Sequence, residues 1–271
     1  VVCAQAPTRA IRRDIPLTNA IRRAHAAGTR DSTGRPGRNY WQTRTDYTIQ
    51  ARFDAATSRV SGHETVVIHN NSDSALRSIQ LRLDQNLYAP NVPRATQVSE
   101  ITDGMVVTRL TVNGEAVDLS PPVRRPGGAA PQPRLTATGI TQTTARITLP
   151  TPIPAHATAT LEADWNFKVP NADNGRGLRM GSWGDSLAQV AQWYPRVAVY
   201  DDLRGWDTDP YLGPSEFYNN FGRFDVSLDV PGGWVVSGTG VLQNPRDVLT
   251  AAARERLAHA LESDSIITIV G

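Results

Sequence analysis

Residues 45–69 read TDYTIQARFDAATSRVSGHETVVIH. From Tyr47 to Phe53 apolar residues alternate with polar ones, which is the period of a half-buried β-strand. A second strand is expected over Val60–His69, and the turn-forming residues of Asp54–Ser58 join the two strands. This segment therefore predicts a β-hairpin at the start of a folded body.

Similar patterns continue along the chain. Apolar residues between Leu76 and Leu87 predict a third strand, and Asn113-Gly114 is a turn pair typical of a two-residue hairpin loop. Residues 121–134, PPVRRPGGAAPQPR, form a Pro/Gly-rich insertion that we expect to be a surface loop. Further strands are predicted over 145–149, 157–167, 190–200, 223–230, 233–240 and 266–270.

Residues 247–262 carry the single clear helical pattern of the body. The apolar residues of this stripe are Val248, Leu249, Ala252, Leu257 and Leu261, with Arg254 and Arg256 on the opposite face. The fold class expected is mainly β, with one late α-helix and a basic, largely irregular N-terminal arm.

Composition limits the possible classes of protein. Among 271 residues, 39% are hydrophobic and 20% are charged, so the chain can bury a core and is not wholly disordered. The single cysteine, Cys3, excludes a disulfide framework and a thiolate metal site. No run of about 18 apolar residues occurs, which excludes a membrane-spanning helix of ordinary length.

Charge is distributed unevenly. The net charge is only +2, too small for a nucleic-acid binder if it is spread evenly. Residues 1–44 nevertheless hold nine arginines against Asp14 and Asp31. The eight arginines that we expect to bind a partner or an anionic membrane surface are Arg9, Arg12, Arg13, Arg22, Arg23, Arg30, Arg35 and Arg38. The alternative is that this arm is a solvated tail.

The N-terminal arm also carries local signals. Ile11-Arg12-Arg13 is repeated ten residues later as Ile21-Arg22-Arg23, and Thr18 or Asn19 can cap a short helix that ends at Gly28. Residues 1–6, VVCAQA, read like the end of a secretory signal, with Val2 and Ala4 at the positions before cleavage. We therefore expect a periplasmic or extracellular protein, peripheral to the membrane. The division expected is residues 1–39 as signal remnant and arm, and residues 40–271 as one β-domain.

The residues offer few catalytic arrangements. His63 and His69 lie six residues apart in a strand pattern, about 20 Å, so they cannot share a metal ion. There is no Gly-x-Ser-x-Gly elbow, and the Gly-rich segment 175–184 lacks the Lys-Ser/Thr ending of a phosphate-binding loop. One loop is rich in aspartate, with two alternative roles: the carboxylates hold calcium, or they form turns and pair with Arg196 and Arg204. These aspartates are Asp201, Asp202, Asp207 and Asp209.

One set of motifs has a recognisable order. It begins with Gly62-His63-Glu64-Thr65 and Leu81-Arg82-Leu83-Asp84-Gln85-Asn86-Leu87-Tyr88. It continues with Gln192-Trp193-Tyr194-Pro195-Arg196, Gly205-Trp206, Pro210-Tyr211, Glu216-Phe217-Tyr218-Asn219-Asn220-Phe221-Gly222 and Gly238-Thr239-Gly240. In these motifs residues 40–271 resemble the N-terminal domain of zinc metallopeptidases of the aminopeptidase N family.

The resemblance implies a saddle-like β-sandwich that walls one side of a substrate cleft. It does not extend to catalysis, because the HExxH motif and the Gly-Ala-Met-Glu-Asn loop of that family are absent. The position of the family's substrate-binding glutamine falls near Gly184 and Asp185, so that role is not transferred. The family-motif residues, expected to pack in the core or else to form a recognition surface, are Gln192, Trp193, Tyr194, Pro195, Trp206, Tyr211, Phe217, Tyr218 and Phe221.

Two functions follow. The first is a non-catalytic exported subunit with a structural or protein-binding role, which holds no metal or cofactor. Its arm would attach it to a larger membrane-associated assembly of other protein subunits. The alternative is the front domain of a zinc aminopeptidase whose catalytic half lies outside this chain. The apolar segment 266–270, predicted as a strand, would leave an unpaired edge at the end of the domain. We therefore expect the domain to be incomplete at its C-terminus or covered there by another chain.

Overall fold

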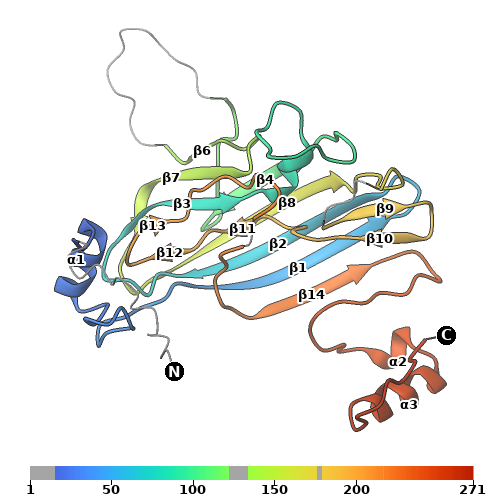
Figure 1. The fold of residues 1–271 in the computed structure, drawn as a ribbon. Helices are drawn as coiled ribbons and strands as arrows, with labels where there is room; N and C mark the ends of the chain where they lie inside the picture. The colour runs from blue at the N-terminus through green and yellow to red at the C-terminus, as the bar shows by residue number, and fades with distance from the viewer. Residues whose placement is uncertain (1–15, 122–133, 176–178, 216, 271) are drawn as a thin grey trace, which may run out of the picture. The chain divides into compact units, whose positions relative to one another are not determined.

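The computed structural model describes residues 16–121, 134–175, 179–215 and 217–270. The chain divides into two compact units, unit 1 up to Pro231 and unit 2 from Gly232 onward (Figure 1). This division lies inside the segment 40–271 that we expected to be one domain.

Unit 1 is built on a six-stranded sheet. Its order is β14-β1-β2-β8-β4-β5, and all neighbours are antiparallel except β14, which runs parallel to β1. The strands are β1 (Arg44–Asp54), β2 (Arg59–His69), β4 (Val106–Val112), β5 (Glu115–Ala116), β8 (Thr158–Lys168) and β14 (Phe224–Asp229). The predicted hairpin is confirmed as β1 and β2, and the turn of the second hairpin uses Asn113 and Gly114, whose φ angles are 51° and 81°.

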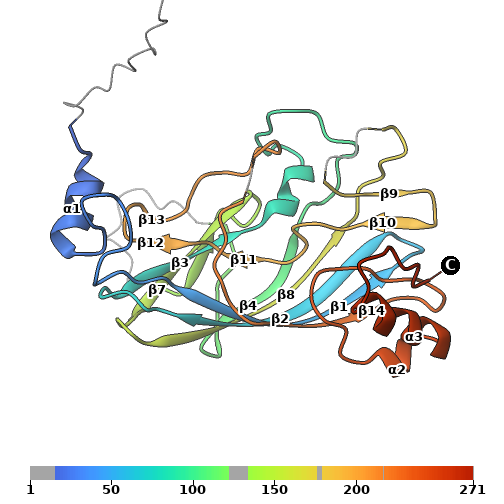
Figure 2. The same cartoon turned by 60° about the horizontal axis from the view of Figure 1, so that its bottom comes forward.

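A smaller sheet forms the second layer (Figure 2). Its order is β11-β3-β7-β6, with β3 at Leu76–Arg82, β6 at Thr136–Thr138, β7 at Thr144–Ile153 and β11 at Arg196–Val197. Two short ribbons accompany it, β9 (Gly181–Trp183) with β10 (Leu187–Gln189), and β12 (Tyr200–Asp201) with β13 (Gly205–Trp206). The mainly β fold class is confirmed.

Two strand predictions were too long. The third strand ends at Arg82, and Asp84–Tyr88 form the 3-10 helix η1. Leu87 is therefore buried as part of a helical turn and not as part of a strand. The predicted strand over 190–200 is reduced to β11 and the first strand of a small ribbon. Apolar periodicity reports burial, but a ladder also needs a neighbouring strand in register.

The core lies between the two sheets. Ile49, Val66 and Leu161 from the large sheet and Ile147 from the small one are almost completely buried. Gly62 leaves room for Trp165, because a Cβ on Gly62 would lie 2.4 Å from the indole ring.

The N-terminal segment contains a capped helix, α1 (Asn19–Ala27). The Thr18 side chain accepts a hydrogen bond from the Ile21 N–H at 3.3 Å, and Gly28 ends the helix with φ 73°. The short helix expected here is confirmed, and Ala24 is its buried residue.

Unit 2 contains two short helices, α2 (Pro245–Val248) and α3 (Ala251–Ala260). The single helix predicted over 247–262 was wrong at its start, because the Thr250 side chain accepts from the Ala253 N–H and begins a new helix. The apolar stripe is not buried either, since Val248 is 58% and Leu261 82% exposed. The strands predicted over 233–240 and 266–270 are also wrong, because no strand forms in either segment.

Candidate functional site

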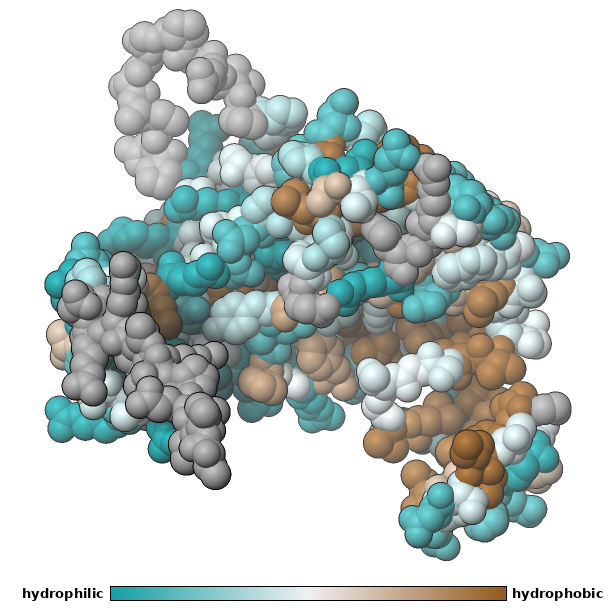
Figure 3. Space-filling model, viewed as in Figure 1, coloured by the Kyte–Doolittle hydropathy of each residue, from teal (hydrophilic) through white to brown (hydrophobic). Residues whose placement is uncertain are grey.

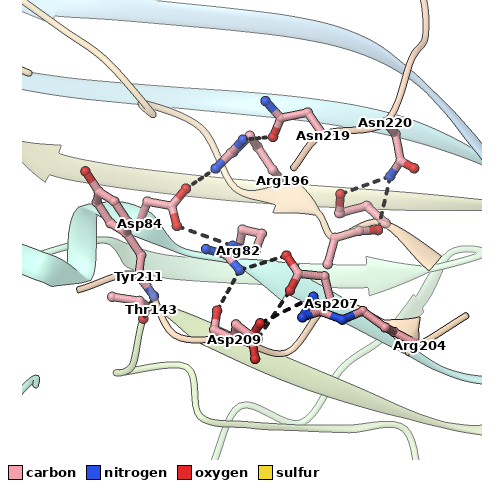
Figure 4. Close-up of polar contacts among 12 residues, drawn as sticks. Arg82, Asp84, Thr143, Arg196, Arg204, Asp207, Asp209, Tyr211, Asn219 and Asn220 are labelled. Atoms are coloured by element: carbon pink, nitrogen blue, oxygen red, sulfur yellow. Dashed lines mark hydrogen bonds and ion pairs between the residues drawn. The ribbon is translucent and has the colours of Figure 1, made fainter. Parts of the chain in front are cut away.

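The family motifs meet in a buried network of charges at the ends of β3 and β11 (Figure 4). Arg82 bonds the Asp207 carboxylate at 3.1 Å and the Asp209 carbonyl oxygen at 2.7 Å. Asp84 forms ion pairs with Arg82 and with Arg196. Each charged side chain of this network therefore faces a side chain of opposite charge, although Asp84 Oδ1 and Arg196 Nε are buried without a hydrogen bond of their own.

The same network ties distant segments of the chain together. Arg196 donates to the Asn219 side chain and lies over the Phe217 ring, 5.0 Å from its centroid. The Asn220 side-chain amide donates to the carbonyl oxygens of Val197 and Ala198 at 3.3 and 3.1 Å. These contacts hold the segment that leads into β14 against the small sheet.

The four aspartates that could have held calcium point to different partners. Asp202 binds Arg30, Asp207 binds Arg82, and Asp209 lies 3.5 Å from Arg204. Asp201 accepts from the backbone N–H groups of residues 203 and 204. No group of three metal-ligating side chains gathers anywhere in the described residues. The expected pairing of Arg204 is observed with Asp209. Arg196 pairs with Asp84 and with none of the four aspartates.

Arg30 is the arm residue that the structure binds most firmly. Its guanidinium donates to both carboxylate oxygens of Asp202, at 3.0 and 2.7 Å, and Thr29 donates to the same carboxylate at 2.7 Å. Burial would raise the pKa of Asp202, but the hydrogen bonds from Arg30 and Thr29 bring it below its ordinary value. Arg30 therefore anchors α1 to the β12–β13 ribbon and is not free for an outside partner.

The other arginines in the described part of the arm do not share this position. Arg22, Arg23, Arg35 and Arg38 are exposed. Arg9, Arg12 and Arg13 lie outside the described residues. No helix in the described part of the chain is both long and apolar enough to cross a bilayer.

The motif aromatics divide between core and surface. Tyr211 is buried, and Trp193, Tyr194, Trp206 and Phe217 pack partly buried against the core. Pro195 is buried, and Gln192 contributes its carbonyl oxygen to the Gln85 side chain at 3.1 Å. Tyr218 and Phe221 are 51% and 77% exposed, so for these two residues core packing was the wrong expectation.

A row of aromatic rings leads from the core to the edge of the large sheet. Trp165 contacts Trp193, and Trp193 contacts Tyr194, with centroids 5.8 and 5.1 Å apart. Tyr194 then lies beside Tyr47, which stacks on Phe224 of β14 at 4.9 Å. The last ring, Phe224, is 47% exposed.

Phe224 begins an apolar stripe on β14. Phe224, Val226 and Leu228 stand in register with Tyr47, Ile49 and Ala51 of β1. The β1 residues are buried, whereas the three on β14 are 47%, 41% and 51% exposed. These three side chains, here called the inner stripe, thus share the core-facing side of the sheet and remain open to solvent. Hydrophobic surface is visible along this strand in Figure 3.

Gly222 brings β14 into this place. A Cβ on Gly222 would lie 1.7 Å from the Thr45 carbonyl oxygen, so only glycine allows the chain to pass so close to β1. The Tyr47 N–H donates to the Arg223 carbonyl oxygen at 2.8 Å directly afterwards. Gly222 belongs to the family motifs, and its role becomes evident only from this close approach to Thr45.

The opposite side of the large sheet is polar. His63 Nδ1 lies 2.6 Å from Asp164, which also accepts from Arg109 at 2.6 Å. A shallow hollow of about 620 Å³ lies beside them. His69 contacts Asp46 instead, so the two histidines have separate carboxylate partners. Among the described residues, the side chains that contact His63 are Asp164 and Arg109.

Comparisons with solved structures return M1 zinc metallopeptidases. A variant of the enzyme from Deinococcus radiodurans has 14% identity and a TM-score of 0.36, over 76% of this chain and 38% of that one. The M1 zinc metallopeptidase from the same organism has 15% identity and a TM-score of 0.33, over 73% of this chain and 34% of that one. This chain thus spans less than two-fifths of the length of these enzymes. No family model and no curated protein matches the sequence.

Proposed function

We propose that this chain is a non-catalytic β-domain whose function is to dock onto another protein body. The observation that carries the proposal is the inner stripe of β14, which lies on the core side of the sheet and is left half exposed. Covering a large apolar side chain fully is worth roughly 1.5–3 kcal/mol, so three half-exposed side chains in a row provide a useful docking surface.

The body that occupies the stripe is, in this proposal, the catalytic domain of a zinc aminopeptidase. The motifs that resemble the aminopeptidase N family support this choice, because the motif residues Trp193 and Tyr194 continue into the stripe through Tyr47 and Phe224. The resemblance implies a domain that walls one side of a substrate cleft. The chain itself is proposed to have no peptidase activity and to hold no zinc.

A second candidate is a structural subunit of an exported, membrane-associated assembly. It is favoured by the exposed guanidinium groups of Arg22 and Arg23 on α1, together with the arginine excess of residues 1–44. Attachment by exposed charge weakens as salt rises, because charges are screened beyond about 8 Å at physiological ionic strength. A salt wash of native membranes that releases the chain would support this candidate.

The first proposal is tested on the native species. The chain is affinity-tagged at its own locus, and the purified material is analysed for intact mass, zinc content and hydrolysis of an aminoacyl-anilide with and without chelator. We expect chelator-sensitive hydrolysis in this material and none in the isolated 271-residue chain.

Substitutions connect this activity to the stripe. V226D/L228D is expected to remove most of the activity from the purified native material. L187D is the matched control, since Leu187 is 57% exposed but lies on β10, which pairs with β9 and not with β14. The proposal is overturned if the native material has no zinc-dependent hydrolysis, or if V226D/L228D and L187D behave alike.

A further inference from the structure

β14 is an edge strand. In the described part of the chain it pairs with β1 on one side and with no strand on the other. An edge strand presents a row of N–H and C=O groups that another strand can pair with. Natural edges are commonly blocked by lysine, proline or a bulge, and residues 224–229 contain neither residue and pair with β1 without a register shift.

The two faces of this edge differ in chemistry. The inner stripe is apolar, whereas the alternate residues Asp225, Ser227 and Asp229 share the polar face. Asp225 forms no ion pair with any described residue, and the contact of Asp229 with Arg52 is long, 3.7 Å, between side chains about 70% exposed. Arg223 precedes the strand, so β14 itself carries two acidic residues and no basic one.

We infer that β14 accepts an additional β-strand from a partner, with apolar side chains over the inner stripe and arginine or lysine side chains opposite Asp225 and Asp229. This inference rests on the proposed function and specifies how the docking surface is used. Backbone pairing supplies affinity in such additions, and alternate side chains supply selectivity.

A second copy of this chain is a poorer occupant. If two β14 strands paired antiparallel about Ser227, Asp225 of one copy would face Asp229 of the other. Like charges directly opposite one another destabilise a strand pair. A partner strand with basic residues on that face removes this repulsion.

The test uses the full chain and three synthetic ten-residue peptides. The first alternates valine and arginine, the second replaces each arginine with glutamate, and the third keeps the first sequence with N-methyl groups on the amides of one edge. Binding is measured by fluorescence anisotropy, and protection of residues 224–229 by hydrogen exchange. We expect saturable binding of the arginine peptide alone, with slowed exchange over 224–229.

Charge is tested with D225N/D229N, which we expect to weaken binding of the arginine peptide roughly tenfold and to reduce its salt dependence, since two exposed ion pairs are lost. D185N is the matched control, because Asp185 is an exposed acidic residue away from β14. An equal effect of both variants, or equal binding of the glutamate peptide, contradicts the charge complementarity.

Equal binding of the N-methylated peptide, or no binding of the arginine peptide, overturns strand addition. Neither result affects the proposed function, which fails independently if the native material lacks zinc-dependent hydrolysis. The two proposals can therefore be rejected separately.

Discussion

Glu64 on β2 is a carboxyl group that the large sheet buries completely. Neither of its oxygens meets a hydrogen-bond donor among the described residues, and Trp165 Nε1 is similarly buried without an acceptor. Burial raises the pKa of Glu64 well above its ordinary value. The group is therefore held in its neutral, protonated form over a wider pH range in the folded state than in the unfolded chain.

The pKa shift of Glu64 predicts how stability depends on pH. Above the ordinary glutamate pKa the unfolded chain loses this proton while the folded chain keeps it, so the free energy of unfolding falls by up to about 1.4 kcal/mol per pH unit. The fall ends where pH passes the raised pKa. E64Q should remove this component, and E115Q, at an exposed site, should keep it. Urea unfolding from pH 4 to 9 measures both, and parallel profiles for wild type and E64Q would contradict the assignment.

Arg196 and Asp84 form a buried ion pair, and replacing one of the two residues alone should destabilise the fold. R196M should lower the free energy of unfolding by about 3–5 kcal/mol, because it leaves the Asp84 carboxylate with less compensation. R204M removes an exposed pair and should cost under about 1 kcal/mol. Urea denaturation of the two variants gives the comparison, and similar losses would mean that the network contributes little.

At the scale of elements, Gly222 controls the position of β14. G222A should displace the strand, because the added Cβ meets the Thr45 carbonyl oxygen, which belongs to the backbone and cannot rotate away. We expect faster hydrogen exchange over residues 224–229 with β2 and β8 unchanged. G232A is the control, since nothing lies within 4 Å of a Cβ there. Unchanged exchange in G222A would show that the close approach is relieved in another way.

The Arg30–Asp202 ion pair is the main charged contact between the α1 segment and the β12–β13 ribbon. R30A should release the helix, because it removes two of the three hydrogen bonds that this segment donates to Asp202, and trypsin should then cleave more rapidly at Arg22 and Arg23. R35A removes an exposed arginine nearby and should leave the cleavage rate unchanged. Timed digestion followed by mass spectrometry distinguishes them. Equal rates would indicate that buried Ala24 and Thr29 suffice to hold the helix.

At the scale of the whole molecule, the core belongs to unit 1. Every residue of the main buried cluster lies before Pro231, and Ala253 is the one buried hydrophobic residue that unit 2 shows in its described part. The fragment 16–231 should therefore unfold in one transition close to that of the full chain. The fragment 232–271, at about 40 residues, should show no cooperative melting by circular dichroism, because so short a chain buries too little surface. A cooperative transition in the second fragment would contradict this.

Local sequence signals determined the parts of the fold whose contacts are also local. The β1–β2 hairpin, the Asn113-Gly114 turn and the caps of α1 all depend on residues within a few positions of one another. Each was predictable, because strand alternation, turn geometry and capping act through neighbours in the chain. The same signals predicted strands over 233–240 and 266–270, where none forms.

Tertiary structure alone decided the candidate site. Arg196 and Asp84 are 112 residues apart, and Arg30 and Asp202 are 172 apart, so no spacing rule could pair them. β14 lies beside β1 although the two strands are far apart in the sequence; Asp46 and Arg223, which are hydrogen-bonded, are 177 residues apart. This placement therefore also depends on the path of the whole chain. Periodicity indicates which side of a strand is apolar, but it does not indicate that this side is buried on β1 and half exposed on β14. A sequence pattern specifies a residue's preference for burial, and the packing of distant segments determines whether that burial is achieved.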